Sequence, residues 1–176
     1  KIESDRNVTR VLFVSHNTEL LNPDQQSLDG YLDVSGLFAE VHILILREGI
    51  KPKQPVLRVS PNVWMYTAAA NLWWQTPAAG IELMQNQLEF AAGFRPDLII
   101  SLDPFESALT VIKLGKMYQK PTQLHVVENY FDPKFDESEP GNFWRRQLTR
   151  FTVEKFASVR TRTETLEKNL HKQFKI

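Results

Sequence analysis

The sequence predicts one α/β domain of the Rossmann-like type, with three layers built around an open, doubly wound parallel sheet. Three observations support this fold class. Short apolar runs alternate along the chain with longer amphipathic stretches, as they do in successive βαβ units. Several runs are apolar at consecutive positions, which is typical of strands covered on both faces. The chain has 176 residues, the length of one ordinary domain.

Six apolar runs are predicted to be the strands of this sheet. They comprise residues 11–15, 41–46, 63–66, 98–102, 122–127 and 159–162. Right-handed crossovers between them would produce a single doubly wound domain over residues 1–176.

The stretches between these runs carry helix signals. Residues 22–25 combine an N-cap, a first-turn proline and a capping-box glutamine, and they predict a helix that ends near Gly36. Thr163 is predicted to cap the last helix, with Glu164 near the positive end of its dipole. Residues 132–141 predict one long loop. Three more helices are predicted from apolar residues at helical spacing: Ile81, Met84, Leu88 and Ala92; Leu109, Ile112 and Met117; and Trp144, Leu148, Phe151 and Phe156.

Charge and composition exclude several classes of protein. Lys+Arg and Asp+Glu both number 21, and this balance argues against a general nucleic-acid binder, which needs excess cations. The chain has no cysteine, so disulfides, thiolate nucleophiles and cysteine metal sites are excluded. No stretch approaches the roughly 18–20 apolar residues that span a bilayer. We therefore expect a cytoplasmic protein.

Ligands of open parallel sheets bind beyond the carboxyl ends of the strands. The candidate site residues are the polar side chains that follow the predicted strands: Ser15, His16, Asn17, Asp103, Glu106, Glu128, Asn129 and Arg162. Such hydrogen-bonding groups suit a sugar or another polyhydroxylated ligand. The alternative for each residue is a structural role, because strand-to-helix turns favour the same residue types as caps.

His16 and His125 are the natural acid–base candidates, since the ordinary pKa of histidine lies near neutrality. His16 is expected at the mouth of the crevice, whereas His125 lies inside the fifth strand, where a structural role is the alternative. GxGxxG and GxxxxGK[ST] are both absent, so dinucleotide and P-loop interpretations lose their main support. No His/Asp cluster has metal-ligand spacing in the sequence, and no metal is expected.

Several ordered segments together resemble the amino-terminal domain of glycosyltransferase family four, whose members are retaining enzymes of GT-B fold. Residues 11–15 and 37–46 look like the family's first βαβ unit. Residues 94–101 are similar to the family's "kPDlIhs" strand and residues 120–126 to its "kPlqlhvH" strand. Residues 142–164 resemble its "n…r…e…l..Ad.vr..se" segment. The likeness covers nearly the whole chain.

The resemblance implies a division of labour between two domains. This domain would bind the acceptor, a sugar, glycan or lipid-linked saccharide, and a second, carboxy-terminal domain absent from this chain would hold the nucleotide-sugar donor. The isolated chain is then expected to be inactive, and neither cofactor nor metal is expected. The histidine that relatives carry after the fifth strand falls at Val127 here, so Glu128 or Asn129 is expected to contact the reacting sugar.

Other functions stay open at this level. A non-catalytic binding or interaction module could use the same architecture, whereas an oxidoreductase or ligase is disfavoured by the missing glycine fingerprint. Trp73, Trp74, Arg145, Arg146 and Arg150 could suit contact with the inner face of a membrane. The alternative is a packed aromatic segment and a solvated helix face.

Overall fold

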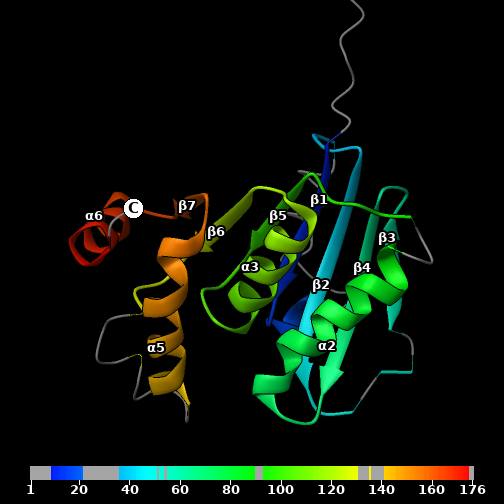
Figure 1. Cartoon of the computed structure of the whole chain (residues 1–176), viewed down its shortest axis with the longest axis horizontal. Coiled ribbons are helices and arrows are strands. Elements are labelled where there is room, and N and C mark those ends of the chain that lie inside the picture. Colours follow the sequence, from blue (N-terminus) through cyan, green and yellow to red (C-terminus); the bar gives the residue numbers. More distant parts are fainter. Residues whose placement is uncertain are drawn as a thin grey trace, which may run out of the picture.

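The computed structural model describes residues 9–21, 36–50, 52–53, 55–89, 93–130, 135 and 141–174. These residues form one seven-stranded sheet with helices packed against it (Figure 1). The strands, in sheet order, are β3 (Val56–Ser60), β4 (Val63–Ala70), β2 (Glu40–Glu48), β1 (Arg10–Ser15), β5 (Leu98–Ser101), β6 (Thr122–Val126) and β7 (Ser158–Thr161).

Six of the strands are parallel, and their order from β4 to β7 is that of a doubly wound Rossmann-like sheet. The predicted fold class is confirmed. The chain runs outward from β1 through β2 to β4, then returns to β5 on the other side of β1. This reversal places the topological switch point between β1 and β5.

One strand was not predicted and is not parallel. β3 pairs antiparallel with β4 at the edge of the sheet, so the sheet is mixed. The sequence signal is weak because Val56–Ser60 is short, and Val56, Leu57 and Arg58 are exposed. β4 also extends beyond its predicted end, because Ala68–Ala70 continue the ladder opposite Leu46–Glu48. Alanine has low β-propensity, and pairing outweighs it here.

The helical elements confirm most of the predicted helices. α2 (Thr76–Leu83) follows the 3₁₀ turn η2 (Trp73–Gln75) and continues into the π-helical turn η3 (Met84–Glu89). α3 spans Glu106–Tyr118. α6 (Glu164–Gln173) begins as predicted, since Thr163 Oγ1 accepts a hydrogen bond of 3.3 Å from the Leu166 amide. The helix predicted after residue 22 and most of the predicted loop 132–141 lie outside the described residues.

The helix predicted from Trp144, Leu148 and Phe151 is present as α5 (Asn142–Thr152), which leads into the 3₁₀ turn η4 (Val153–Lys155). Its apolar residues do not all face the core, because Trp144 and Phe151 are exposed. The buried face is polar instead and consists of Asn142, Thr149 and Thr152. The helix turns this way because its polar groups find backbone partners, such as Thr152 Oγ1 donating to Pro104 O at 2.8 Å.

Apolar side chains alternate between the two faces of the sheet. On one face Leu12 and Val14 join a core with Met84 and Leu114, beneath α2 and α3. On the other face Val11, Phe13 and Ile43 join a second core with Leu20 of the 3₁₀ turn η1 (Thr18–Leu21). A third core lies toward β6 and α6. Within the described residues, no helix combines the length and apolar character needed to cross a bilayer.

Candidate functional site

A cleft of about 510 Å³ opens at the switch point, beyond the carboxyl ends of β1, β5 and β6. This is the position where open α/β sheets bind their ligands. We call it the switch-point cleft. Its walls mix polar groups with aromatic rings, and its lining residues are Ser15, His16, Asn17, Thr18, Glu19, Leu102, Asp103, Phe105, Val127, Glu128, Tyr130, Phe135, Asn142 and Arg145.

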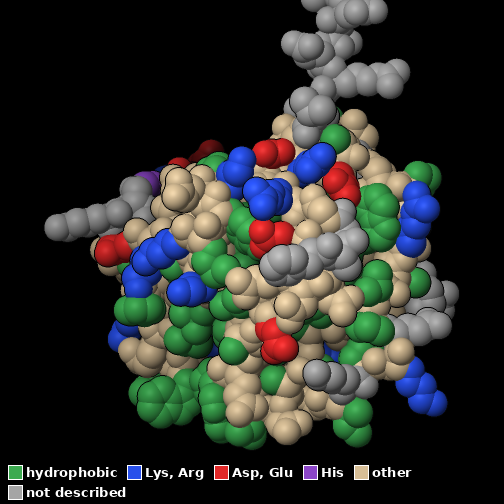
Figure 2. All heavy atoms as spheres, turned by 45° about the vertical axis from the view of Figure 1, so that its right-hand side comes forward, with side chains coloured by type: hydrophobic (Ala, Val, Ile, Leu, Met, Phe, Trp, Pro, Cys, Tyr) green, Lys and Arg blue, Asp and Glu red, His purple; other side chains and the backbone are tan. Residues whose placement is uncertain are grey.

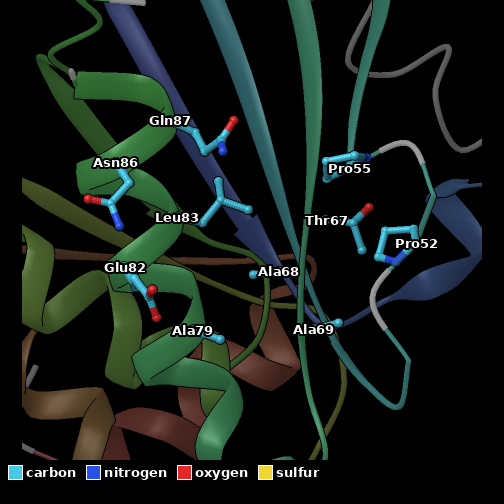
Figure 3. A pocket seen from close by; sticks show the side chains of 10 residues that line it. All are labelled: Pro52, Pro55, Thr67, Ala68, Ala69, Ala79, Glu82, Leu83, Asn86 and Gln87. Carbon is cyan, nitrogen blue, oxygen red and sulfur yellow. The ribbon is translucent and has the colours of Figure 1, made fainter. Parts of the chain in front are cut away.

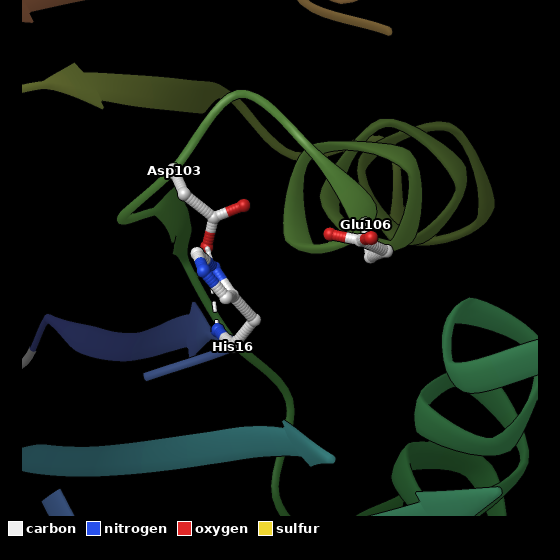
Figure 4. Close-up of side chains that lie close together, drawn as sticks. All are labelled: His16, Asp103 and Glu106. Carbon is white, nitrogen blue, oxygen red and sulfur yellow. Dashed lines mark hydrogen bonds and ion pairs between the residues drawn. The ribbon is translucent and has the colours of Figure 1, made fainter. Parts of the chain in front are cut away.

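His16 and Asp103 form the centre of this cleft, although they lie 87 positions apart in the sequence (Figure 4). Nδ1 of His16 lies 2.9 Å from Oδ2 of Asp103, and the His16 amide donates to the same oxygen at 3.3 Å. Oδ1 of Asp103 accepts from the Phe105 amide at 3.0 Å. The carboxylate is buried, whereas the His16 side chain is 33% exposed. The pair thus fixes the imidazole with one edge toward the cleft.

Opposing effects set the protonation of this pair. Burial lowers the pKa of His16, but the charge of Asp103 and its hydrogen bond outweigh burial and leave that pKa raised. Burial raises the pKa of Asp103, yet the His16 charge and the hydrogen bonds it accepts leave the carboxyl pKa lowered. His16 Nε2 has no hydrogen-bond partner in the described part of the chain. That nitrogen is available to a ligand hydroxyl.

Arg145 lines the cleft and forms an ion pair with Glu106, which lies beneath the cleft wall. Glu106 is the first residue of α3, and its carboxylate is buried. Arg145 Nε lies 3.5 Å from Glu106 Oε1, and its guanidinium carbon lies 5.6 Å from the centre of the Phe105 ring. The contact joins α3 to α5. Glu106 does not line the cleft, so its predicted contact with substrate would have to pass through Arg145 or through movement of the site.

The ligand atoms of His16, Asp103 and Glu106 lie within 4.8 Å of one another. A divalent cation at this point would need a neutral imidazole and free carboxylate oxygens. The raised pKa of His16 opposes the first requirement, and the Arg145 ion pair engages one of the two Glu106 oxygens. The other Glu106 oxygen is buried and has no hydrogen-bond partner in the described part of the chain, so the absence of a metal stays a prediction.

The carboxyl end of β6 contributes the segment 127–130. Val127 and Glu128 line the cleft and are exposed, and Asn129 beside them is exposed as well. Tyr130 turns inward, and its ring packs edge-on against Phe105 at 4.8 Å. Burial, followed by the charges of Asp103 and Glu128, raises the pKa of Tyr130. Glu128 is therefore placed to meet a ligand, while its catalytic role and that of Asn129 remain predictions.

Two further predicted substrate-binding residues, besides Glu106, lie outside the cleft. His125 Nε2 lies 2.9 Å from Gln123 Oε1, within β6. Burial, and then the charge of Arg160, lower the pKa of His125 to about 4, so its ring is neutral at physiological pH. Arg162 is exposed just beyond β7. The structure supports a structural role for His125, and it brings neither side chain to His16.

Two polar residues of the cleft, Asn142 and Arg145, were missed by the sequence reasoning. Asn142 was not considered, and Arg145 was assigned to a solvated face, whereas it is half-buried against Glu106. Asn142 Nδ2 donates to Phe135 O at 2.7 Å. A usable signal did exist, because Asn142, Arg145, Thr149 and Thr152 recur at helical spacing and form a polar stripe.

A second cavity, of about 270 Å³, lies between α2 and β4 (Figure 3). Its floor is made of small side chains such as Ala68, Ala69 and Ala79, with the amides of Asn86 and Gln87 on its wall. Among its described lining residues Glu82 alone is titratable. Compared with this cavity, the switch-point cleft gathers more titratable groups at the carboxyl ends of the strands, and we take it as the candidate site.

The doubly wound sheet and its polar switch-point cleft define a Rossmann-like α/β domain. Its fold is similar to that of an α,α-trehalose-phosphate synthase (UDP-forming) from Burkholderia vietnamiensis, with a TM-score of 0.51 and 13% identity. The match covers 93% of this chain and 43% of that one. The chain thus shares the fold of part of that enzyme and spans less than half of its length. No family model and no curated protein matches it.

Proposed function

We propose that this chain is the acceptor-binding domain of a glycosyltransferase that uses a nucleotide-sugar donor. The observation that carries the proposal is the switch-point cleft, in which His16, Asn17 and Glu128 present hydrogen-bonding groups to a ligand. The scaffold shared with a GT-B glycosyltransferase supports it. The acceptor would be a sugar, a glycan or a lipid-linked saccharide, and a second domain would hold the donor.

His16 would act on the acceptor hydroxyl through Nε2. Asp103 holds the opposite ring nitrogen, which fixes the tautomer and stabilises the imidazolium that forms when the ring takes a proton. A general base works best when its pKa is near the working pH, and the Asp103 carboxylate moves the pKa of His16 upward toward it. Developing charge would be stabilised by protein groups such as Arg145, which lines the cleft.

The family resemblance implies transfer with retention of the anomeric configuration. The His16–Asp103 pair favours a second candidate, transfer with inversion. A base that deprotonates the acceptor hydroxyl suits one direct displacement, in which the attack opposes the departing diphosphate. The anomeric proton coupling of the product distinguishes these two outcomes by NMR.

The function is tested by a transfer assay on the protein in which this domain is joined to its donor-binding half. Nucleotide sugar should be consumed when an acceptor is present, and Glu128→Ala should lower turnover about ten- to a hundredfold, as expected for loss of a charged hydrogen bond. Because Glu128 is exposed, the Tm of the Glu128→Ala variant should scarcely differ from that of wild type.

Glu48→Ala is the matched control, because Glu48 is an exposed carboxylate at the end of a strand outside the cleft. It should leave turnover intact. A marked loss of stability in Glu128→Ala would make Glu128 a structural residue. If the joined protein consumes no nucleotide sugar, the enzymatic proposal fails and a non-catalytic binding module takes its place.

A further inference from the structure

The outer face of α5 is an exposed aromatic surface on a helix whose inner face is polar. Phe143, Trp144 and Phe151 are 48%, 60% and 59% exposed. At 3.6 residues per turn they fall on one side of the helix, and Arg146 and Arg150 flank them. We call these five residues the α5 face.

Basic side chains lie next to these rings, although the chain as a whole has no net charge. The whole chain balances 21 basic against 21 acidic residues, whereas α5 carries three arginines and no acid; Arg145 among them faces Glu106, and the turn η4 adds one acid, Glu154, and one base, Lys155. Arg146 lies 5.9 Å from the Phe143 ring centre, and Lys155 Nζ lies 2.8 Å from that of Phe151. Figure 2 shows hydrophobic and cationic side chains alternating on the side of the molecule where α5 lies in Figure 1.

The size of the surface argues against a second copy as its occupant. Three half-exposed aromatic side chains present roughly 350 Å² of apolar area. A stable protein interface needs about 800 Å² per partner. Aromatic rings flanked by arginines are instead what an interfacial helix presents to a bilayer, because the rings enter the headgroup region while cations meet anionic lipid.

The opposite side of the same helix reaches the switch-point cleft. Asn142 and Arg145 line the cleft, while their neighbours Phe143 and Trp144 point outward. We propose that the α5 face docks the domain on an anionic lipid bilayer, with the switch-point cleft beside the membrane surface. Docking in this way extends the proposed function toward lipid-linked acceptors.

Co-sedimentation of this chain with vesicles tests the docking. Phosphatidylcholine vesicles containing about 30% phosphatidylglycerol should retain the protein at low salt, and phosphatidylcholine alone should not. Raising the salt to about 500 mM should release it, because the Debye length shrinks. Trp144→Ser/Phe151→Ser should weaken partition about tenfold or more. Arg146→Gln/Arg150→Gln should weaken it about thirtyfold, since each cation contributes roughly a fivefold factor.

Two matched controls isolate the α5 face. Leu57→Ser alters a half-exposed apolar residue on β3, at the far edge of the sheet (Figure 1). Lys168→Gln/Lys172→Gln removes the same charge from α6. Both should bind within about twofold of wild type, and thermal melts should show all variants folded.

Three results would overturn the docking: no sedimentation at low salt, an equal loss in the controls, or light scattering that shows a dimer abolished by the aromatic changes. The last would identify a second copy as the occupant. The assay needs neither donor nor acceptor, so its failure would leave the transfer proposal standing, and failure of transfer would leave the docking standing.

Discussion

Replacing Asp103 by asparagine is expected to bring the pKa of His16 below its ordinary value of 6.5. The Asp103 charge and hydrogen bond now outweigh the effect of burial, and without them burial and then the charge of Arg145 lower that pKa. The substitution should also cost about 2 kcal/mol of unfolding free energy. This loss of stability is smaller than for a fully buried ion pair, because a third of the His16 side chain is exposed and solvent screens its charge.

The pH dependence of that cost follows from the directions of the two shifts. His16 has a raised folded pKa, so its contribution is complete below pH 6.5 and is lost as the pH rises through the folded value. Asp103 has a lowered folded pKa, so its contribution is present above about pH 3.9 and is lost as the pH falls through the folded value. The stability gap between wild type and variant should therefore be largest between about pH 4 and 6.5.

NMR titration of the histidine ring signals measures the pKa, and denaturant unfolding at several pH values measures the gap. Asp97→Asn is the matched control, because Asp97 pairs with Lys120 at the surface, away from the cleft. It should leave the His16 titration unchanged. A His16 pKa that does not move in Asp103→Asn would show that the two side chains are not coupled in solution.

Phe94→Ala is expected to destabilise the domain by about 3–5 kcal/mol, the range for deleting a buried aromatic ring. Phe94 is 1% exposed, and its ring stacks on His42 at 3.8 Å, beside Trp64 and Tyr66. Burial is the main cause of the lowered pKa of His42. Opening this cluster should therefore also raise the pKa of His42 toward 6.5.

Denaturant unfolding with an unchanged m-value would measure this loss. Phe143→Ala on the exposed face of α5 is the control and should change stability by less than about 0.5 kcal/mol. A cost below about 1 kcal/mol for Phe94→Ala would contradict the packing of this cluster.

The spacing of apolar residues in the sequence predicted most of the fold. Consecutive apolar positions located six parallel strands, and the strand-end rule then named His16 and Asp103, which meet across 87 residues. The strands and the site residues could both be predicted, because strands buried on both faces need apolar runs and the carboxyl ends of parallel strands meet at one edge of the sheet. The predicted Thr163 cap was confirmed for the same reason, since capping is a local interaction.

The features that the sequence did not predict depend on tertiary contacts. β3 forms because the edge of β4 offers free backbone groups, not because Val56–Ser60 has a strong pattern. α5 turned its polar stripe inward because Thr152 and Asn142 find backbone acceptors in the folded chain. Arg145 joined the site through Glu106, a partner 39 positions away that no local rule connects to it.

On the proposed function, the switch-point cleft binds an acceptor saccharide at His16. The most direct test titrates this chain with saccharides while the ring signals of His16 and the amide of Asn17 are observed by NMR. An acceptor sugar should shift these signals in wild type and bind at least tenfold more weakly in Asp103→Asn, whereas nucleotide sugar alone should leave them unmoved. Shifts confined to the cavity between α2 and β4, or none at millimolar saccharide, would contradict it.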